Sequence, residues 1–192
     1  MQSFSKTTET AARVELLELH AILLQHTLAE NVLCGSFRRF EIAVTGCPYE
    51  FPLATEVPEL MRAFLQWLND SARDMHPVVF ATEAHLRFVT IHPFEDGNGR
   101  MSRLIMCLVL MRRGYVPIII NPACNPEYKG FVKHYQVTKM NPHTGNVGDI
   151  EKLLKLVANE LLGALDLITD EAQAQAQAQA QEQTALAGDA AV

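Results

Sequence analysis

A helix-length segment in the middle of the chain is apolar on nearly every side. Its apolar residues are Leu104, Ile105, Cys107, Leu108, Val109, Leu110 and Met111. A helix of this composition is stable only when neighbouring elements cover it all round, so it belongs in the centre of a domain. Gly114 follows the segment and ends the predicted helix. The rest of the chain therefore has to supply elements that surround a buried helix.

Most of the remaining sequence shows helical patterns. Apolar residues recur at helical spacing in four further stretches, at 14–28, 60–68, 80–91 and 150–168. The stretch 41–51 contains a glycine and a proline and is expected to form two short strands around a turn. A chain of 192 residues is long enough for one ordinary domain. The sequence thus predicts an all-α domain of about six to eight helices with one small β-hairpin.

The two ends of the chain differ from this central part. Residues 1–13 are polar and lack the apolar stretch of a secretory signal. Residues 14–170 are expected to form the domain, and residues 171–192, where Ala and Gln alternate, are interpreted as a low-complexity tail. Because Ala and Gln are good helix formers, the tail is expected to extend the last helix as a solvated appendage. The alternative is a segment that associates with a second copy of the chain.

Composition and charge exclude several classes of protein. The net charge is −6, and the chain lacks the clustered basic face that nucleic-acid binding requires. No apolar run is long enough for a membrane span, and the predicted location is the cytoplasm. The four cysteines form no CxxC pair and are interpreted as buried thiols rather than a disulfide framework or a zinc site. They are Cys34, Cys47, Cys107 and Cys124.

The run HPFEDGNGR at 92–100 joins two predicted helices. Gly97 and Gly99 permit a ligand to approach the main chain closely, and a glycine-rich turn that opens a helix presents unpaired N–H groups to an anion. Arg100 and Arg103 fall in the first turn of the second helix, where the helix dipole disfavours cations. A bound polyphosphate would give both arginines a partner.

Two further side chains add chemistry to this run. Asp96 offers a hard oxygen ligand suited to Mg²⁺ held between a carboxylate and a phosphate. His92 can accept a proton from a hydroxyl group near neutral pH. The alternative interpretation is a simple linker between two helices, since the run is rich in turn-forming residues. Because a base, an acid, an amide, two glycines and two arginines converge within 92–103, we favour a functional site.

The run resembles the signature of the Fic family, HxFx(D/E)GN(G/K)R. The matching residues are His92, Phe94, Asp96, Gly97, Asn98, Gly99 and Arg100. Segments elsewhere are similar to those that accompany the signature in the family, at 19–20 with 35–38, at 76–78 with 84–85, and at 114–117. The resemblance covers roughly residues 14–165 and implies a Fic-type helical domain.

The resemblance implies an enzyme that transfers AMP from ATP to a hydroxyl side chain of a target protein and releases pyrophosphate. His92 would deprotonate the Ser, Thr or Tyr of the target. Asp96 would coordinate Mg²⁺ between the α- and β-phosphates. Phe94, inside the nucleotide-binding loop, would anchor that loop in the core.

The same resemblance assigns the phosphate contacts. Asn98 would hold the α-phosphate, and the amides of Gly97 and Gly99 would line an anion hole. Arg100 would engage the β-phosphate side, and Arg103 would reach the γ-phosphate.

Two more parts of the family's site have counterparts by position. Tyr135 and Asn146 resemble residues that contact the adenosine. The predicted hairpin at 41–51 occupies the place of the family's flap, which clamps a target segment by adding a strand to it. The alternative for the hairpin is a plain surface connection.

Regulation is expected to differ from that of many family members. Those members carry an inhibitory helix with the pattern (S/T)xxxE(G/N), whose glutamate pairs with the arginine equivalent to Arg103. The stretches 5–10 and 26–31 match this pattern only in part. Three alternatives follow: inhibition by a separate antitoxin-like protein, constitutive activity, or an inhibitory helix upstream in a longer parent protein. Without that glutamate, AMP transfer is favoured over AMP removal; a homodimer is compatible with either.

Two other functions compete with protein adenylylation. One is a Fic-type enzyme that transfers another nucleotide, phosphate or phosphocholine, although the phosphate-transferring branch has Lys where this chain has Gly99. The other is a non-catalytic domain that binds a nucleotide and a partner. The intact His92, Asp96 and Arg100 argue against that degenerate alternative.

Overall fold

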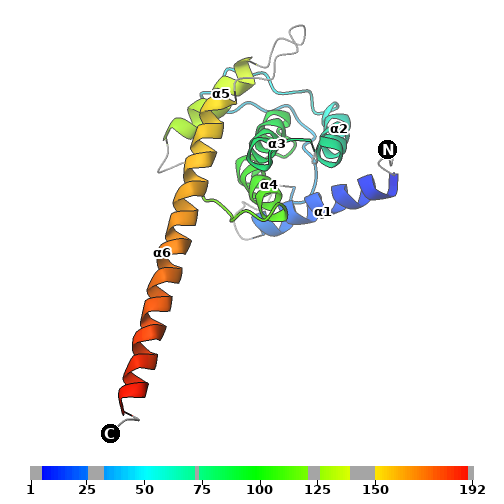
Figure 1. The fold of residues 1–192 in the computed structure, drawn as a ribbon. Coiled ribbons are helices and arrows are strands. Elements are labelled where there is room, and N and C mark those ends of the chain that lie inside the picture. Colours follow the sequence, from blue (N-terminus) through cyan, green and yellow to red (C-terminus); the bar gives the residue numbers. More distant parts are fainter. Residues whose placement is uncertain (1–5, 26–32, 72–73, 121–125, 139–149, 190–192) are drawn as a thin grey trace.

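The computed structural model describes residues 6–25, 33–71, 74–120, 126–138 and 150–189. Within these ranges the chain is all-helical, as predicted, and contains six helices and no strand. The helices are α1 (Lys6–Leu24), α2 (Val57–Asp70), α3 (Pro77–Ile91), α4 (Asn98–Arg112), α5 (Pro126–Thr138) and α6 (Glu151–Asp189). Figure 1 shows α3 and α4 in the middle, with α1 and α2 on one side and α5 and α6 on the other.

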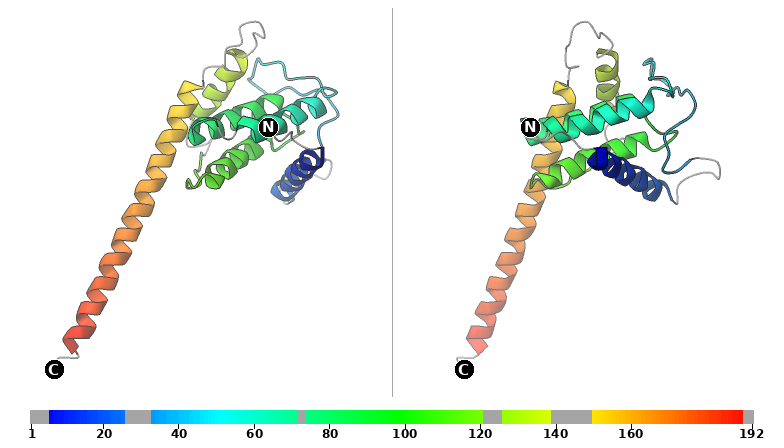
Figure 2. Two further views of the ribbon diagram at one scale, coloured as in Figure 1. Left: turned by 45° about the vertical axis from the view of Figure 1, so that its right-hand side comes forward. Right: turned by 90° about the vertical axis from the view of Figure 1, so that its right-hand side faces the viewer.

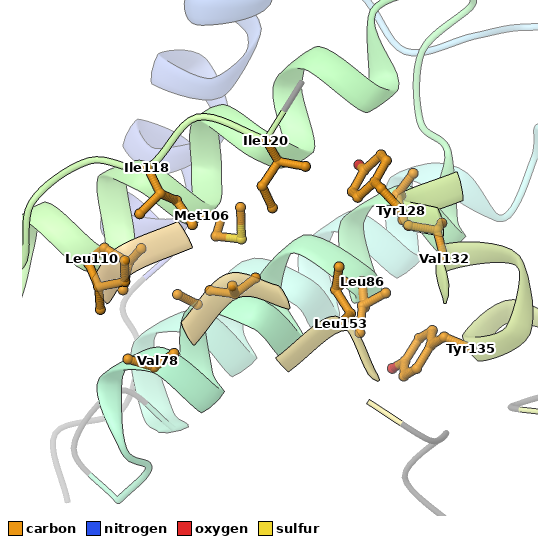
Figure 3. Packing of buried hydrophobic residues seen from close by; sticks show 14 residues of the cluster. Val78, Leu86, Met106, Leu110, Ile118, Ile120, Tyr128, Val132, Tyr135 and Leu153 are labelled. Carbon is orange, nitrogen blue, oxygen red and sulfur yellow. The ribbon is translucent and has the colours of Figure 1, made fainter. Parts of the chain in front are cut away.

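The hydrophobic core lies on both sides of the central pair α3 and α4. On one side the pair packs against α5, α6 and the segment 115–120, and Figure 3 shows Met106 and Leu110 of α4 near Ile118 and Ile120. On the other side the pair packs against α1 and α2. The predicted central position of the apolar segment is therefore confirmed. Met111 at its end is 52% exposed, however, and α3 is buried along more of its length than α4.

Helices α3 and α4 meet at a junction that local sequence explains. Pro77 opens α3, where a missing N–H is tolerated, and His76 caps this end by accepting a hydrogen bond from the N–H of Val78. Helix α3 ends at Ile91, and the C-cap residue His92 that follows has left-handed backbone angles. Helix α4 begins after Gly97, also left-handed, and no side chain caps its N-terminus. The junction thus leaves N–H groups of α4 available to a ligand.

The prediction of two strands at 41–51 is wrong. The segment makes a turn in which the N–H of Cys47 bonds to the carbonyl of Val44 at 2.9 Å, but no strand is assigned on either side of the turn. Prolines at 48 and 52 have no N–H to donate to a ladder. We refer to residues 40–52 as the flap loop, because they keep the position of the predicted hairpin beside the 92–100 run.

Helix α6 extends far beyond the body of the molecule. Its first part is buried through Leu153, Val157 and Leu161, whereas Leu167 and Ile168 are exposed. The helix continues through the Ala/Gln repeat to Asp189, and both views in Figure 2 show it projecting away from the other helices. None of the described helices combines the length and the apolar character that a membrane crossing needs.

The cysteines fit the prediction only in part. Cys34 is an exposed free thiol, which contradicts the expectation that it is buried. Cys47 and Cys107 are half-buried free thiols, and the Cys107 thiol donates to the carbonyl of Ile118 at 3.1 Å. Exposure at position 34 follows from its place in a loop after α1 rather than in a helix. Cys124 lies outside the described residues.

Candidate active site

His92 lies at the end of α3, where its backbone turns out of the helix. Its φ angle is 53°, and its N–H still bonds to the carbonyl of Phe88. Nδ1 of the ring lies 3.0 Å from the carbonyl oxygen of Val89. Since a carbonyl oxygen only accepts, Nδ1 carries the proton of the neutral ring and Nε2 holds the lone pair. His92 is therefore oriented as a base.

The surroundings of His92 favour its neutral form. Burial lowers its pKa below the ordinary value of 6.5. The hydrogen bond to Val89 raises the pKa, the charge of Arg38 lowers it, and the charge of Asp96 raises it, all by less than burial does. The ring is thus ready to accept a proton at neutral pH.

Asn98 fixes the loop between the two helices. Its side-chain oxygen accepts from the N–H of Phe94 at 2.9 Å, and its Nδ2 donates to the carbonyl of Phe94 at 2.8 Å. The residue is 3% exposed. The structure therefore places the Asn98 side chain inside the loop as a brace, and its expected contact with the α-phosphate stays a prediction.

Phe94 anchors the same loop in the hydrophobic core, and His20 of α1 packs against Phe94. Phe94 is fully buried, and its ring stacks on the ring of His20 with centroids 3.6 Å apart. The N–H of Gly35 donates to Nδ1 of His20 at 2.9 Å, so Nε2 carries the proton and donates to the carbonyl of Asp96 at 3.1 Å. Burial lowers the pKa of His20, which keeps the ring neutral in this role.

Gly97 is required both by its backbone angle and by its surroundings. Its φ is +79°, a region that side chains disfavour. A Cβ atom at this position would lie 3.1 Å from a methyl group of Leu24 and 3.3 Å from Nε2 of His20. The start of α4 is thus packed tightly against α1.

Asp96 and the two motif arginines occupy different places. Asp96 accepts from the N–H of Gly97 at 2.6 Å and pairs with Arg100 at 3.0 Å. The Asp96 and Arg100 side chains are 52% and 35% exposed. Arg103 instead points toward α5, where its Nη1 donates to the hydroxyl of Tyr128 at 3.4 Å. Among the described residues, Asp96 belongs to no group of three or more His, Cys, Asp or Glu that could hold a metal by themselves.

A cavity of about 380 Å³ connects these elements. It lies between the flap loop, the end of α3, the start of α4 and α5. Its charged lining residues are the cations Arg103, Lys129 and Lys133, and none of its described lining residues is Asp or Glu. His92 and Gly99 also line it. A cavity with this lining favours an anionic ligand.

Comparisons with known proteins agree with this geometry. Residues 11–110 match the model of the Fic/DOC family, which is more than half of the chain. The chain belongs to the Fic/DOC family. It is 38% identical over 154 residues to the protein adenylyltransferase Fic of Drosophila grimshawi, and the match covers 80% of this chain and 29% of that relative. The chain therefore spans less than a third of the length of this relative.

Two solved structures share the fold. A Fic-domain-containing signalling protein from Bacteroides thetaiotaomicron superposes with a TM-score of 0.70 at 26% identity, covering 81% of this chain and 61% of that chain. Fic-1 from C. elegans also gives a TM-score of 0.70 at 26% identity, covering 90% of this chain and 47% of that one. The helical arrangement around the α3–α4 junction is thus that of a Fic domain.

Of the predicted Fic site residues, His92, Gly99 and Arg103 line the cavity. Phe94, Asp96, Gly97, Asn98, Arg100 and Tyr135 are not among its lining residues. Tyr135 is 1% exposed and packs in the hydrophobic core, where burial raises its pKa to about 12. Asn146 lies outside the described residues. Sequence reasoning instead missed Tyr128, Val132 and Gln136, which line the cavity. Their spacing of four residues, one face of a helix, was the signal that could have found them.

Proposed function

We propose that this chain is a protein adenylyltransferase, which transfers AMP from ATP to a Ser, Thr or Tyr hydroxyl of a target protein and releases pyrophosphate. The observation that carries the proposal is the cavity itself, which brings His92, the start of α4 and three cations together, with no Asp or Glu among its described lining residues. The 38% identity to the Drosophila grimshawi protein adenylyltransferase Fic supports the same reaction.

The cavity offers ATP two kinds of surface. The phosphates would lie at the start of α4, where the N-cap residue Gly97 has no side chain to cap the helix and Arg103 lines the cavity. The base and ribose would lie against α5, where Val132 supplies apolar surface and Gln136 a polar group. Gln136 is 3% exposed and donates to the carbonyl of Val89 at 3.3 Å, so its amide has a fixed orientation.

Mg²⁺ is part of this proposal. Asp96 is the residue that would hold it, because its carboxylate is half-exposed beside the N-terminus of α4. One carboxylate, with phosphate oxygens and water supplying the other ligands, is a usual environment for this ion. When bound, Mg²⁺ would neutralise phosphate charge as pyrophosphate leaves.

The reaction needs one base, and His92 fits that role. The target hydroxyl gives its proton to Nε2 of His92, and its oxygen forms a bond to the α-phosphorus. The bond between the α-phosphorus and the bridging oxygen breaks, and its electron pair leaves with pyrophosphate. Because burial lowers the pKa of His92, the base is neutral at the start of the reaction.

The target protein would enter beside the flap loop. Phe51 of this loop lies against His92, with ring centroids 4.4 Å apart, so the loop borders the base. An inhibitory glutamate beside Arg103 is absent among the described lining residues of the cavity. We therefore propose that restraint, where it exists, comes from outside the cavity, for example from a separate antitoxin-like protein or a second copy of the chain.

Labelled ATP tests the proposal. With ATP labelled at the α-phosphate, we expect the chain or an added acceptor protein to become labelled in the presence of Mg²⁺. With ATP labelled at the γ-phosphate, we expect none. Label from the γ-position would indicate phosphate transfer instead, and ATP binding without any label would favour a non-catalytic binding domain.

A further inference from the structure

We propose that Arg38 is a positioning residue that holds His92 and the flap loop together as one unit. The inference rests on the proposed function, because it takes His92 as the base of that reaction. Arg38 follows α1 in a loop, and its side chain is fully buried. The 92–100 run by itself does not predict that an arginine from so distant a part of the sequence contacts it.

The guanidinium of Arg38 reaches three carbonyl groups in different segments. Nε donates to the carbonyl of His92 at 2.8 Å. Nη1 donates to the carbonyl of Phe40 at 3.1 Å, and Nη2 to that of Pro52 at 2.5 Å. The backbone N–H of Arg38 adds a bond to the carbonyl of Pro93 at 2.9 Å. One side chain thus joins both ends of the flap loop to the base.

These bonds act on His92 from two sides. The bond to its carbonyl holds the backbone of His92 in its left-handed conformation at the end of α3. The bond to Pro52 fixes the residue next to Phe51, whose ring lies 4.4 Å from the His92 ring. A change in the position of the flap loop is therefore transmitted to the base through Arg38.

Burying this charge is costly, which argues for a specific role. The only ion pair of Arg38 within the described residues is with Glu41 at 3.7 Å, and the Glu41 side chain is 61% exposed. A buried cation bonded mainly to neutral carbonyls is stabilised less than a paired one. Only a planar group with five N–H donors can reach three carbonyls in this fork, and lysine cannot.

The charge of Arg38 also acts on His92. It lowers the pKa of His92, while Asp96 acts in the opposite direction. The charged residues that line the cavity next to His92 are Arg103, Lys129 and Lys133. Substitutions of Arg38 that keep or remove the charge can therefore separate geometry from electrostatics.

The test compares Arg38→Lys and Arg38→Met with a matched control, Arg39→Lys, at the exposed neighbouring position. The readout is pyrophosphate release from ATP, with water or the chain's own hydroxyls as acceptor, so no target has to be known. We expect Arg38→Lys to lower kcat by about 10- to 100-fold, because a misplaced base loses about that much. The KM for ATP should stay within about twofold, since α4 and α5 provide the ATP contacts.

The pH profile gives a readout that a merely structural role would not move. Arg38→Met removes a positive charge, so the pKa of His92 rises and the acidic limb of kcat moves to higher pH. Arg38→Lys keeps the charge, and its limb should stay nearer that of the wild type. A kcat for Arg38→Lys at the wild-type level, or a loss of kcat matched by an equal loss of ATP binding, would overturn the proposal.

A second variant keeps the inference testable if the Arg38 variants do not fold. Phe51→Ala leaves Arg38 in place and removes the ring that borders His92, and we expect kcat to fall several-fold. An unchanged kcat in this variant would contradict the coupling of loop and base. If wild type and Arg39→Lys release pyrophosphate while the Arg38 variants do so equally well, only this inference fails. If the wild type itself is inactive, the proposed function fails with it.

Discussion

The two loops that border the cavity are held in opposite ways. The loop between α3 and α4 is fixed by buried groups. Phe94 is fully buried, and the side chain of Asn98 bonds to both the N–H and the carbonyl of Phe94. The flap loop is largely exposed, with Phe40 at 68%, and the guanidinium of Arg38 bonds to both of its ends. We call the loop between α3 and α4 the rigid wall of the cavity, and the flap loop, by contrast, is attached at few points.

The difference between the two loops can be understood from what a reacting phosphate and a protein substrate each require. Electrostatic stabilisation of a reacting phosphate requires donors that do not reorganise during the reaction. A protein substrate, by contrast, has to enter and leave, and loops serve that purpose well when a rigid scaffold holds their ends. Arg38 provides such a hold, because it bonds both ends of the flap loop and leaves its tip to other contacts.

The largest effect is expected at the base on the rigid wall. His92→Ala should lower AMP transfer by about 10²- to 10⁴-fold, the usual contribution of a general base. ATP binding should be nearly unchanged, because the proposed phosphate contacts come from α4. Rates of α-label incorporation and equilibrium dialysis with ATP measure the two quantities. His134→Ala, at an exposed position of α5, is the matched control and should keep the wild-type rate. AMP transfer by His92→Ala at the wild-type rate would show that His92 is not the base.

Acid should lower the free energy of unfolding through His85, a buried residue of α3 next to the rigid wall. Burial lowers its pKa from 6.5 to about 4, and its Nε2 lies 3.1 Å from the hydroxyl of Tyr128, the partner of Arg103. A depressed folded-state pKa means that the unfolded chain binds the proton more tightly. The stability is therefore present above pH 6.5 and lost as the pH falls toward 4, up to roughly 3 kcal/mol.

Urea unfolding between pH 7 and pH 4 measures this loss. His85→Gln retains an acceptor for Tyr128 but does not titrate, so its stability should fall less steeply with acid than that of the wild type. Equal slopes for the two proteins would show that His85 is not the acid-sensitive group.

Substitutions at two glycines with similar backbone angles allow a direct comparison of the rigid wall with the flap loop. Gly97 in the rigid wall has φ +79°, and Gly46 in the flap loop has φ +75°. An added Cβ would be 3.1 Å from Leu24 at Gly97 but would meet nothing within 4 Å at Gly46. We expect Gly97→Ala to lower the free energy of unfolding by about 1–3 kcal/mol and Gly46→Ala by about 1 kcal/mol. Thermal unfolding of both variants checks this order, and a larger loss at Gly46 would reverse the comparison.

The smallest effect is expected at a contact to the tip of the flap loop. Lys133 is exposed, and its Nζ donates to the carbonyl of Gly46 at 2.8 Å. Because exposed polar contacts add little, Lys133→Met should change the free energy of unfolding by less than about 0.5 kcal/mol. A loss well above 1 kcal/mol in urea unfolding would mean that the tip is held as firmly as the rigid wall.

The sequence predicted the rigid wall better than the flap loop, for physical reasons. The 92–100 run combines an N-terminal helix position, glycines and charged groups, all of which have local signatures. The central helix was predictable from its apolar residues. In contrast, the predicted strands at 41–51 failed because the carbonyls of Phe40 and Pro52 are satisfied by the Arg38 side chain rather than by a ladder.

Contacts between distant segments were the part that local patterns could not predict. The two bonds of the Asn98 side chain to Phe94 depend on the shape of the loop, and the expected contact of Asn98 with the α-phosphate stays a prediction. The resemblance pointed to Tyr135, whereas the neighbouring residue Gln136 lines the cavity, and a shift of one residue on a helix turns a side chain by about 100°. The four-residue spacing of Tyr128, Val132 and Gln136 places them on one face of α5, but tertiary packing decides that this face meets the cavity.

Mass spectrometry of the chain and an added acceptor protein after incubation with ATP and Mg²⁺ tests the central claim most directly. The account predicts an AMP adduct on a Ser, Thr or Tyr side chain with the wild type, and no adduct with His92→Ala. Bound ATP without any adduct, a phosphate adduct in place of AMP, or equal adducts from wild type and His92→Ala would contradict it.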